Sequence, residues 1–181
     1  ACPHAGYIYS GSVAAHAYKA LKEDRKPETI IIIGPNHTGF GPGVSIYPEG
    51  EWTTPLGDVK IDKGLAEKIG SEFSLDESAH ATEHSVEVQV PLLQYIYNDF
   101  KIVPICMMDQ RLETAVKLGK VLSENLDPQK HMVIASTDFS HYVPNDTAYK
   151  NDLKIINHIR ALDAEKTFDT ASEDESMCGF G

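Results

Sequence analysis

The sequence has little positive charge and no long apolar segment. Its 181 residues include 16 Lys and Arg against 27 Asp and Glu, a formal net charge of -11. This excess repels phosphate backbones and anionic lipid, so neither nucleic acid nor a membrane is expected as a partner. No apolar run approaches the roughly 20 residues that cross a bilayer. Because no basic segment, hydrophobic stretch and cleavage site open the chain, we expect a cytoplasmic protein.

Cysteine is also scarce. The three cysteines, Cys2, Cys106 and Cys178, are odd in number and widely spaced, which favours reduced thiols over a disulfide framework. A chain of this length with 41% hydrophobic residues can bury one core and is short for two, so a single domain over 1–181 is predicted. It opens in a motif-like turn and stops abruptly, and we expect native sequence on both sides.

Apolar runs typical of strands alternate with stretches of helical periodicity. Strands are expected at 29–33, 101–106 and 131–136. Helices are expected at 10–21 with Ser10 as the cap, at 62–69, from Glu83 onward with a kink at Pro91, at 112–125 and at 146–162. The segments 34–57 and 71–81 are expected to be irregular. This alternation predicts an α/β domain with a central, mostly parallel sheet.

Histidines and an aspartate fall where strands are expected to end. Ligands of open α/β sheets bind beyond the carboxyl ends of the strands. His37 follows the strand at 29–33, and His4 lies in a comparable turn; each has a glycine within two residues. Imidazole binds iron, copper or zinc, although a histidine taken alone more often has a structural hydrogen-bonding role. The shared placement of His4 and His37 favours a common polar pocket.

Two further polar pairs admit two interpretations each. Asp138 and His141 could orient a metal-bound histidine, hold a water or act as general acid and base. Alternatively, Asp138 caps the next turn and His141 lies on the surface. Glu83 and His84 are either polar residues at a helix start or an acid and a base that point into the cleft.

Cys178 could add a sulfur ligand. It precedes Gly179, where close backbone approach is possible, and its thiolate would complete a site with His4 and His37. The alternative is a small buried hydrophobe, as a lone cysteine usually is. Residues 34–39 follow a strand but lack the Lys-Ser/Thr ending of a phosphate-binding loop, so nucleotide binding has little support.

Six ordered motifs resemble the MEMO-like family across essentially the whole chain. They are Pro3-His4-Ala5-Gly6-Tyr7, Gly34-Pro35-Asn36-His37, Thr54-Pro55-Leu56-Gly57, Glu83-His84-Ser85-Val86-Glu87, Ser136-Thr137-Asp138-Phe139-Ser140-His141 and Cys178-Gly179. The resemblance implies a fold similar to LigB-type class III extradiol dioxygenases. Such a fold has a central mixed, mostly parallel sheet, helices on both faces and a non-haem metal pocket at one edge.

The resemblance also implies a metal-ligand set. His4, His37 and Cys178 would hold the metal, with the thiolate in place of the dioxygenase carboxylate. A thiolate is softer than a carboxylate and favours reduced iron or copper, with zinc as a further possibility. Ring-opening dioxygenation therefore does not follow from the fold. His84, Asp138 and His141 would line the same pocket as the catalytic candidates.

Three functions remain open at this point. The first is a metal-dependent redox enzyme of dioxygenase type that uses iron or copper. The second is a metal-free hydrolase or transferase with Cys178 as nucleophile, His37 or His141 as base and Asp138 as the orienting acid. The third is a non-catalytic module whose histidine-lined cleft binds a small molecule or a peptide.

Overall fold

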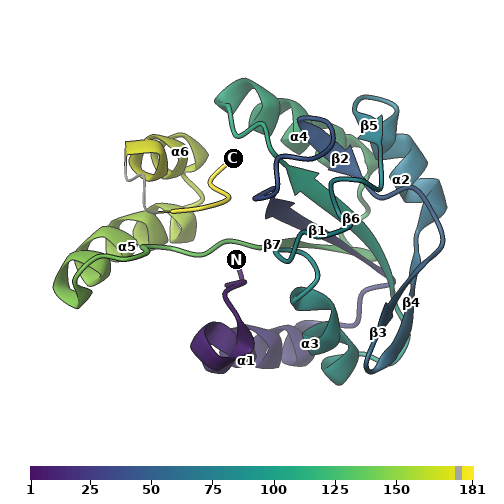
Figure 1. The fold of residues 1–181 in the computed structure, drawn as a ribbon, viewed down its shortest axis with the longest axis horizontal. Coiled ribbons are helices and arrows are strands. Elements are labelled where there is room, and N and C mark those ends of the chain that lie inside the picture. Colours follow the sequence, from purple (N-terminus) through teal and green to yellow (C-terminus); the bar gives the residue numbers. More distant parts are fainter. Residues whose placement is uncertain (174–176) are drawn as a thin grey trace.

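The computed structural model describes residues 1–173 and 177–181 and is built around a seven-stranded mixed sheet (Figure 1). Its main path runs β3-β4-β6-β1-β7. These strands are β1 (Thr29–Pro35), β3 (Glu51–Thr54), β4 (Gly57–Ile61), β6 (Lys101–Met107) and β7 (His131–Ala135). The pairs β4–β6, β6–β1 and β1–β7 are parallel, which confirms the predicted mostly parallel sheet.

The central strand β1 is buried on both faces. Ile30, Ile31 and Ile32 have no exposed surface, as expected for a continuous β-branched run between two parallel neighbours. Full burial of each such side chain contributes about 1.5–3 kcal/mol. On β7, by contrast, Ile134 is buried while Val133 is 45% exposed. The core is therefore densest around β1, whose end carries the first candidate motif.

Helices cover both faces of the sheet (Figure 1). Helices α1 (Tyr7–Asp24) and α3 (Gln89–Ile96) contact each other on one face. Helices α2 (Lys63–Gly70) and α4 (Leu112–Asn125) contact each other on the opposite face. The Asp62 side chain accepts a hydrogen bond from Leu65 N, so the predicted cap of α2 is confirmed.

The predicted start of the first helix is wrong. Helix α1 begins at Tyr7 after Gly6, and the Ser10 hydroxyl donates to the Ala5 carbonyl at 2.8 Å inside the first turn. The periodic apolar residues mark only the inward face, where Ala14 and Tyr18 are buried. The exposed residues of the first turn lack this apolar periodicity, so the pattern does not reveal where the helix begins.

The predicted helix from Glu83 is also wrong, because α3 begins only at Gln89. The backbone from Ser85 to Val88 forms turns instead, and the Glu83 carboxylate accepts from the backbone N–H of Ser85 at 2.9 Å. Pro91 consequently lies in the first turn of α3. Backbone N–H groups there have no intrahelical partner, so the proline removes no hydrogen bond from the helix.

Several short elements escape the sequence patterns. The segment 34–57 contains β2 (Val44–Ile46) and β3, which forms a hairpin with β4, and the segment 71–81 contains β5 (Ser74–Leu75). Strands of two to four residues give too few alternations for period-2 patterning to be recognised. In the hairpin, Thr54 pairs with Gly57, whose φ of 115° suits glycine.

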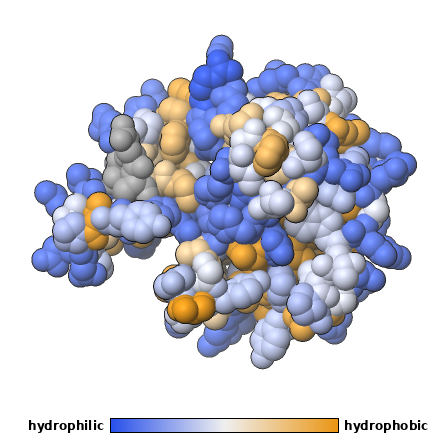
Figure 2. Space-filling model, viewed as in Figure 1, coloured by the Kyte–Doolittle hydropathy of each residue, from blue (hydrophilic) through white to orange (hydrophobic). Residues whose placement is uncertain are grey.

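Two helices extend beside the sheet. Helix α5 (Asn145–Arg160) matches the expected region 146–162, and α6 (Ala164–Glu173) was not predicted. They pack on each other around a small core that includes Ile155, Ala171 and Met177. Figure 2 shows that hydrophilic residues cover most of this face of the molecule. Within the described ranges, no helix is both long and apolar enough to span a membrane.

Candidate metal centre

The strand ends bring His4, His37 and Cys178 together. One potential ligand atom from each of these residues lies within 4.8 Å of the other two. His37 comes two residues after the last residue of β1. His4 follows Cys2, which pairs with Ser136 just beyond β7. The sequence placed both histidines after strands, and the fold brings the two turns to the same edge of the sheet.

The C-terminal segment carries Cys178 to this edge. Its backbone N–H donates to the Asp138 carbonyl at 3.2 Å, and the Thr137 hydroxyl donates to the Cys178 carbonyl at 2.6 Å. Gly179 has a φ of 70°, and a Cβ there would lie 3.0 Å from Pro35 Cδ. Only glycine fits this position without strain, so the expected close backbone approach is observed.

The orientation of His4 follows from a buried hydrogen-bond network. The Ser136 hydroxyl donates to the Ser85 carbonyl at 2.6 Å, and its oxygen accepts from Gln89 Nε2 at 2.7 Å. The same oxygen lies 3.1 Å from His4 Nδ1 and has no second proton to give. Nδ1 therefore carries the proton. Nε2 directs its lone pair toward Cys178 Sγ, 3.1 Å away.

A carboxylate fixes the orientation of the His37 ring in the same way, by pairing with its Nδ1 atom. Glu83 is 2% exposed, and one of its oxygens lies 2.9 Å from His37 Nδ1 while the other accepts from the His37 backbone N–H. The segment that holds Glu83 packs against Gly34, where a Cβ would lie 2.6 Å from Ser85 Oγ. A carboxylate on Nδ1 leaves Nε2 free for a metal, an arrangement common in histidine metal sites.

The cluster has strongly shifted proton affinities. Burial opposes ionisation of the Cys178 thiol, but hydrogen bonds, led by that from His37, outweigh it and lower the pKa to about 6. Hydrogen bonds to Cys178 and Glu83 raise the pKa of His37 to about 10. Burial also opposes ionisation of Glu83, yet hydrogen bonds from His37 and Ser85 lower its pKa to about 2. Thiolate and carboxylate thus enclose the His37 ring in the metal-free protein.

Asp138 and His141 lie beside the cluster. Asp138 Oδ1 accepts from the His4 backbone N–H at 2.8 Å, and Oδ2 lies 3.7 Å from His4 Nε2 and 3.9 Å from His141 Nε2. Asp138, His141 and Cys178 form a second group with potential ligand atoms within 4.8 Å. Asp138 therefore helps position the His4 backbone and faces the same space as the three candidate ligands.

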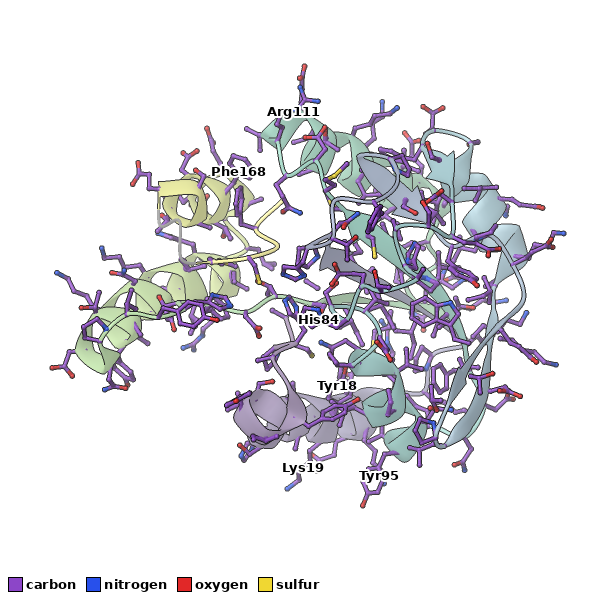
Figure 3. All side chains as sticks on the ribbon, viewed as in Figure 1. Tyr18, Lys19, His84, Tyr95, Arg111 and Phe168 are labelled. Atoms are coloured by element: carbon purple, nitrogen blue, oxygen red, sulfur yellow. The ribbon has the colours of Figure 1, made fainter. Side chains whose placement is uncertain are left out.

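His84 closes another side of the cluster. Its ring stacks on that of His37 with centroids 4.9 Å apart, and its Nδ1 lies 3.4 Å from Glu83 Oε1. Figure 3 places His84 in the middle of the molecule, near the C-terminal segment. Its side chain is 51% exposed. Burial of the remainder, with the charge of His37, lowers its pKa although Glu83 raises it. The half-exposed His84 ring therefore lies between the cluster and solvent.

Some residues of the site were not identified from the sequence. Ser136 and Gln89 set the tautomer of His4, but neither was singled out for this role. Ser136 is the first residue of one of the six family motifs, and this position is the signal in the sequence that could have identified it. Gln89 could be recognised only from the true start of α3, and the apolar periodicity places that start too early. Glu83 admits two interpretations in the sequence, and in the structure its carboxylate faces His37 Nδ1.

Comparison with known proteins assigns a family. The family described as Memo-like protein matches residues 1–181. The chain belongs to the Memo-like family. A MEMO1 family protein of Methanopyrus kandleri is 48% identical over 99% of this chain and 66% of its own length. Corresponding proteins of Methanothermobacter thermautotrophicus and Saccharolobus islandicus are 49% and 46% identical, over 67% and 66% of their lengths. The chain thus spans about two thirds of these relatives.

Proposed function

We propose that this Memo-like chain binds iron or copper through His4 Nε2, His37 Nε2 and Cys178 Sγ. The observation that carries the proposal is the preset orientation of both imidazoles. Ser136 and Glu83 occupy the two Nδ1 atoms, so both Nε2 atoms lie beside one acidic thiol, and His37 Nε2 becomes a ligand once it gives up its proton. Two imidazoles and a thiolate suit iron and copper in their reduced states, and zinc is also compatible with this donor set.

The surrounding residues suit an oxidoreductase of dioxygenase type. Bound iron or copper would supply redox chemistry and Lewis acidity. His84 and His141 are 51% and 36% exposed, so each can pass protons between the centre and solvent. Asp138 Oδ2 lies 3.9 Å from His141 Nε2 and would help to hold that ring at the centre. The buried Glu83 keeps the His37 ring in place during such transfers.

Metal binding by matched variants tests the proposal. The protein and its His4→Ala and His37→Ala variants would be purified without oxygen and titrated with Fe(II) and with Cu(I), followed by elemental analysis. We expect about one equivalent of one metal in the parent and a loss of affinity of at least about 100-fold in each variant. His16→Ala, an exposed histidine of α1, is the control. Equal metal content in all four proteins would refute the proposal.

The acidic thiol also supports a second candidate, a metal-free hydrolase or transferase. A thiolate with a pKa of about 6 beside two histidines is a competent nucleophile. The two functions differ in what the metal does to Cys178. If the thiolate is a ligand, one equivalent of metal protects it from alkylation. Rapid alkylation that iron and copper leave unchanged would instead favour the nucleophile.

A further inference from the structure

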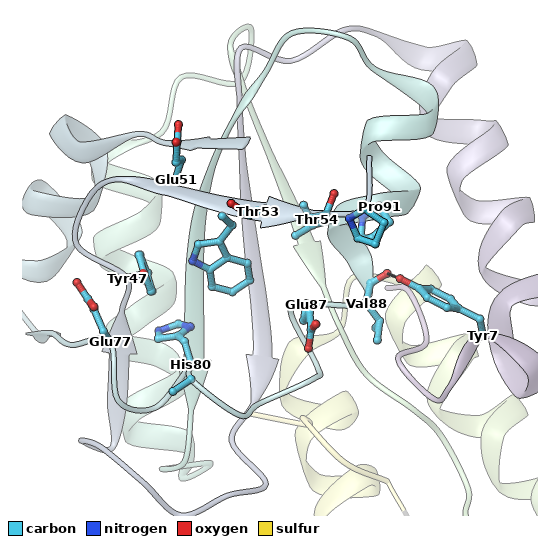
Figure 4. Close-up of a pocket in the computed structure, with 14 residues that line it drawn as sticks. Tyr7, Tyr47, Glu51, Thr53, Thr54, Glu77, His80, Glu87, Val88 and Pro91 are labelled. Atoms are coloured by element: carbon cyan, nitrogen blue, oxygen red, sulfur yellow. Dashed lines mark hydrogen bonds between the residues drawn. The ribbon is translucent and has the colours of Figure 1, made fainter. Parts of the chain in front are cut away.

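The molecule has a cavity that is separate from the cluster of candidate metal ligands. A cavity of about 680 Å³ lies between the β3 strand and the segment that leads into α3 (Figure 4). Among its described lining residues are Trp52 and Thr54 of β3 and Glu87 and Val88 before α3, but none of the three candidate metal ligands. Its size is in the range of small-molecule sites.

One wall of this cavity is aromatic. The rings of Tyr47, Trp52 and His80 meet edge to face, with centroids 5.4 Å apart for Tyr47–Trp52 and 5.9 Å for Trp52–His80. His80 is 7% exposed, and burial lowers its pKa to about 4. It therefore adds a neutral ring near pH 7. Tyr7 stands on the opposite side, where its hydroxyl donates to the Val88 carbonyl at 3.0 Å (Figure 4).

The charged groups of the cavity are all acidic. Glu51, Glu77 and Glu87 line it, and no lysine or arginine occurs among its described lining residues. The carboxylates act on the aromatic rings: burial raises the pKa of Tyr47 and of Tyr7, and the charges of Glu77 and Glu87 respectively raise them further. Since His80 is neutral, nothing in the lining offsets these three negative charges.

We propose that this cavity binds a small organic cation, an amine with an aromatic or apolar body. The body would lie against Trp52 and Tyr47, where ring faces attract an adjacent positive charge and apolar surface leaves water. The ammonium group would pair with the glutamates of the lining. An anion of the same shape would be repelled by all three carboxylates, so charge determines the class of ligand.

The proposal does not depend on metal binding, although the two sites are neighbours in sequence. The turn after β5 supplies His80 to the cavity and Glu83 to the metal-ligand cluster, with Glu83 N donating to the His80 carbonyl at 3.4 Å. The aromatic wall and the three carboxylates involve neither His4 nor Cys178. A His37→Ala variant should consequently keep its affinity for the amine, which separates failure of one proposal from failure of the other.

Trp52 allows a direct binding assay because it is the only tryptophan of the chain. Its fluorescence would be followed during titration with phenethylamine, and the same samples would be measured by calorimetry. The matched probes are 3-phenylpropionate, with the opposite charge, and neutral 3-phenylpropanol. We expect the amine to bind at least about tenfold more tightly than either probe, the ratio that one favourable charge contact of about 1.4 kcal/mol gives. No detectable amine binding, or equal binding of the three probes, would overturn the proposal.

Carboxamide variants identify the charges responsible. The variant E51Q/E77Q/E87Q keeps the shape of the cavity and removes its charge, and we expect it to bind phenethylamine at least about tenfold more weakly. The matched control E23Q/E113Q/E165Q removes the same net charge from exposed positions that do not line the cavity. If both triple variants bind the amine alike, net charge of the molecule and not this site attracts the cation, and the proposal fails.

Discussion

The molecule contains two cysteine–histidine pairs with opposite electrostatics. Cys178 Sγ lies 3.1 Å from His4 Nε2, and Cys106 Sγ lies 3.3 Å from His80 Nδ1. Around Cys178 the thiol pKa is lowered to about 6, whereas burial raises the pKa of Cys106 well above its ordinary value. The two pairs consist of the same residue types at similar distances, so their surroundings cause the difference.

Hydrogen bonds and burial compete in both pairs with different results. Cys178 has a second histidine, His37, whose positive charge Glu83 stabilises, and these interactions outweigh desolvation. Cys106 lies inside β6 with no exposed surface, and nearby Glu83 further disfavours its thiolate. A cysteine next to a histidine is therefore reactive only where a second group stabilises the ion pair. The sheet edge meets that condition, and the strand interior does not.

Thiol reactivity should show the largest difference between the two pairs. In metal-free protein near pH 7.5, iodoacetamide should alkylate Cys178 at least about 1,000-fold faster than Cys106, because the thiolate is the nucleophile and Cys106 is both protonated and inaccessible. Peptide mass spectrometry over time gives both rates in one sample. Buried Cys2, whose pKa is also raised by burial, serves as an internal reference. Comparable rates for Cys178 and Cys106 would remove the basis of the comparison.

The neutral His80 should make the fold sensitive to acid. Its ordinary pKa of 6.5 falls to about 4 in the folded protein, chiefly through burial. Between these values the unfolded chain binds a proton that the folded chain excludes, so stability is lost as the pH falls from about 6.5 to 4. The linkage amounts to about 3 kcal/mol of unfolding free energy.

Denaturant unfolding at pH 7 and pH 4 measures this dependence. His80→Gln cannot be protonated and should lose about 3 kcal/mol less than the parent over the interval. His16→Gln alters an exposed histidine and should follow the parent. The difference between the two pH values is compared, so any constant cost of placing glutamine in the cavity wall cancels. Identical pH dependence in all three proteins would show that His80 is not held neutral.

The hydrogen-bond network that orients His4 should have a smaller effect than the thiol ionisation and the His80 protonation described above, but the effect should still be measurable. Ser136→Ala removes the oxygen that accepts from His4 Nδ1 and from Gln89 Nε2, and it leaves the Ser85 carbonyl without its donor. Unpaired buried groups of this kind cost about 1–3 kcal/mol. Loss of the partner that orients a histidine typically weakens metal binding 10- to 100-fold.

Urea denaturation and metal titration of Ser136→Ala would test both effects. Ser123→Ala is the control, because its hydroxyl donates to the Lys120 carbonyl on the exposed side of α4. A stable Ser136→Ala protein with unchanged metal affinity would show that the tautomer of His4 is set in another way. The pair around Cys106 lacks Ser136 and should keep its slow alkylation in this variant.

The sequence predicts the framework of the site better than its internal contacts. The β-branched run before Gly34 indicates a buried strand, and the polar residues after the expected strands identify His4, His37 and Asp138 as neighbours at one sheet edge. Glycine at 179 likewise indicates a close approach for Cys178. These inferences succeed because strand direction and glycine conformation are local properties with fixed spatial consequences.

The direction of the Glu83 side chain could not be predicted in the same way. An acidic residue before an apolar periodic stretch is also the pattern of a helix start, so the local signal is identical for two structures. The outcome depends on His37, which lies 46 residues earlier and offers the buried carboxylate a backbone and a ring N–H. For the same reason His80 was not recognised, since its neighbours Tyr47, Trp52 and Cys106 come from separate segments.

The smallest expected effect concerns the ion pair that distinguishes the two thiols. Glu83→Gln keeps the side-chain shape and its acceptor for the Ser85 N–H but removes the charge that helps to raise the pKa of His37 to about 10. In metal-free protein the pKa of His37 should fall by about one unit or more, because an opposite charge within hydrogen-bonding distance shifts a pKa by that amount. A titration of the imidazole resonances by NMR measures it.

Glu87→Gln provides the control for this change, since Glu87 belongs to the same segment but faces the cavity beside Tyr7. Its removal should leave His37 unchanged. Because the His37 hydrogen bond is a main cause of the low Cys178 pKa, Glu83→Gln should also slow alkylation of Cys178 below pH 7. An unchanged His37 pKa in Glu83→Gln would show that the carboxylate does not control the acidity of Cys178 through His37.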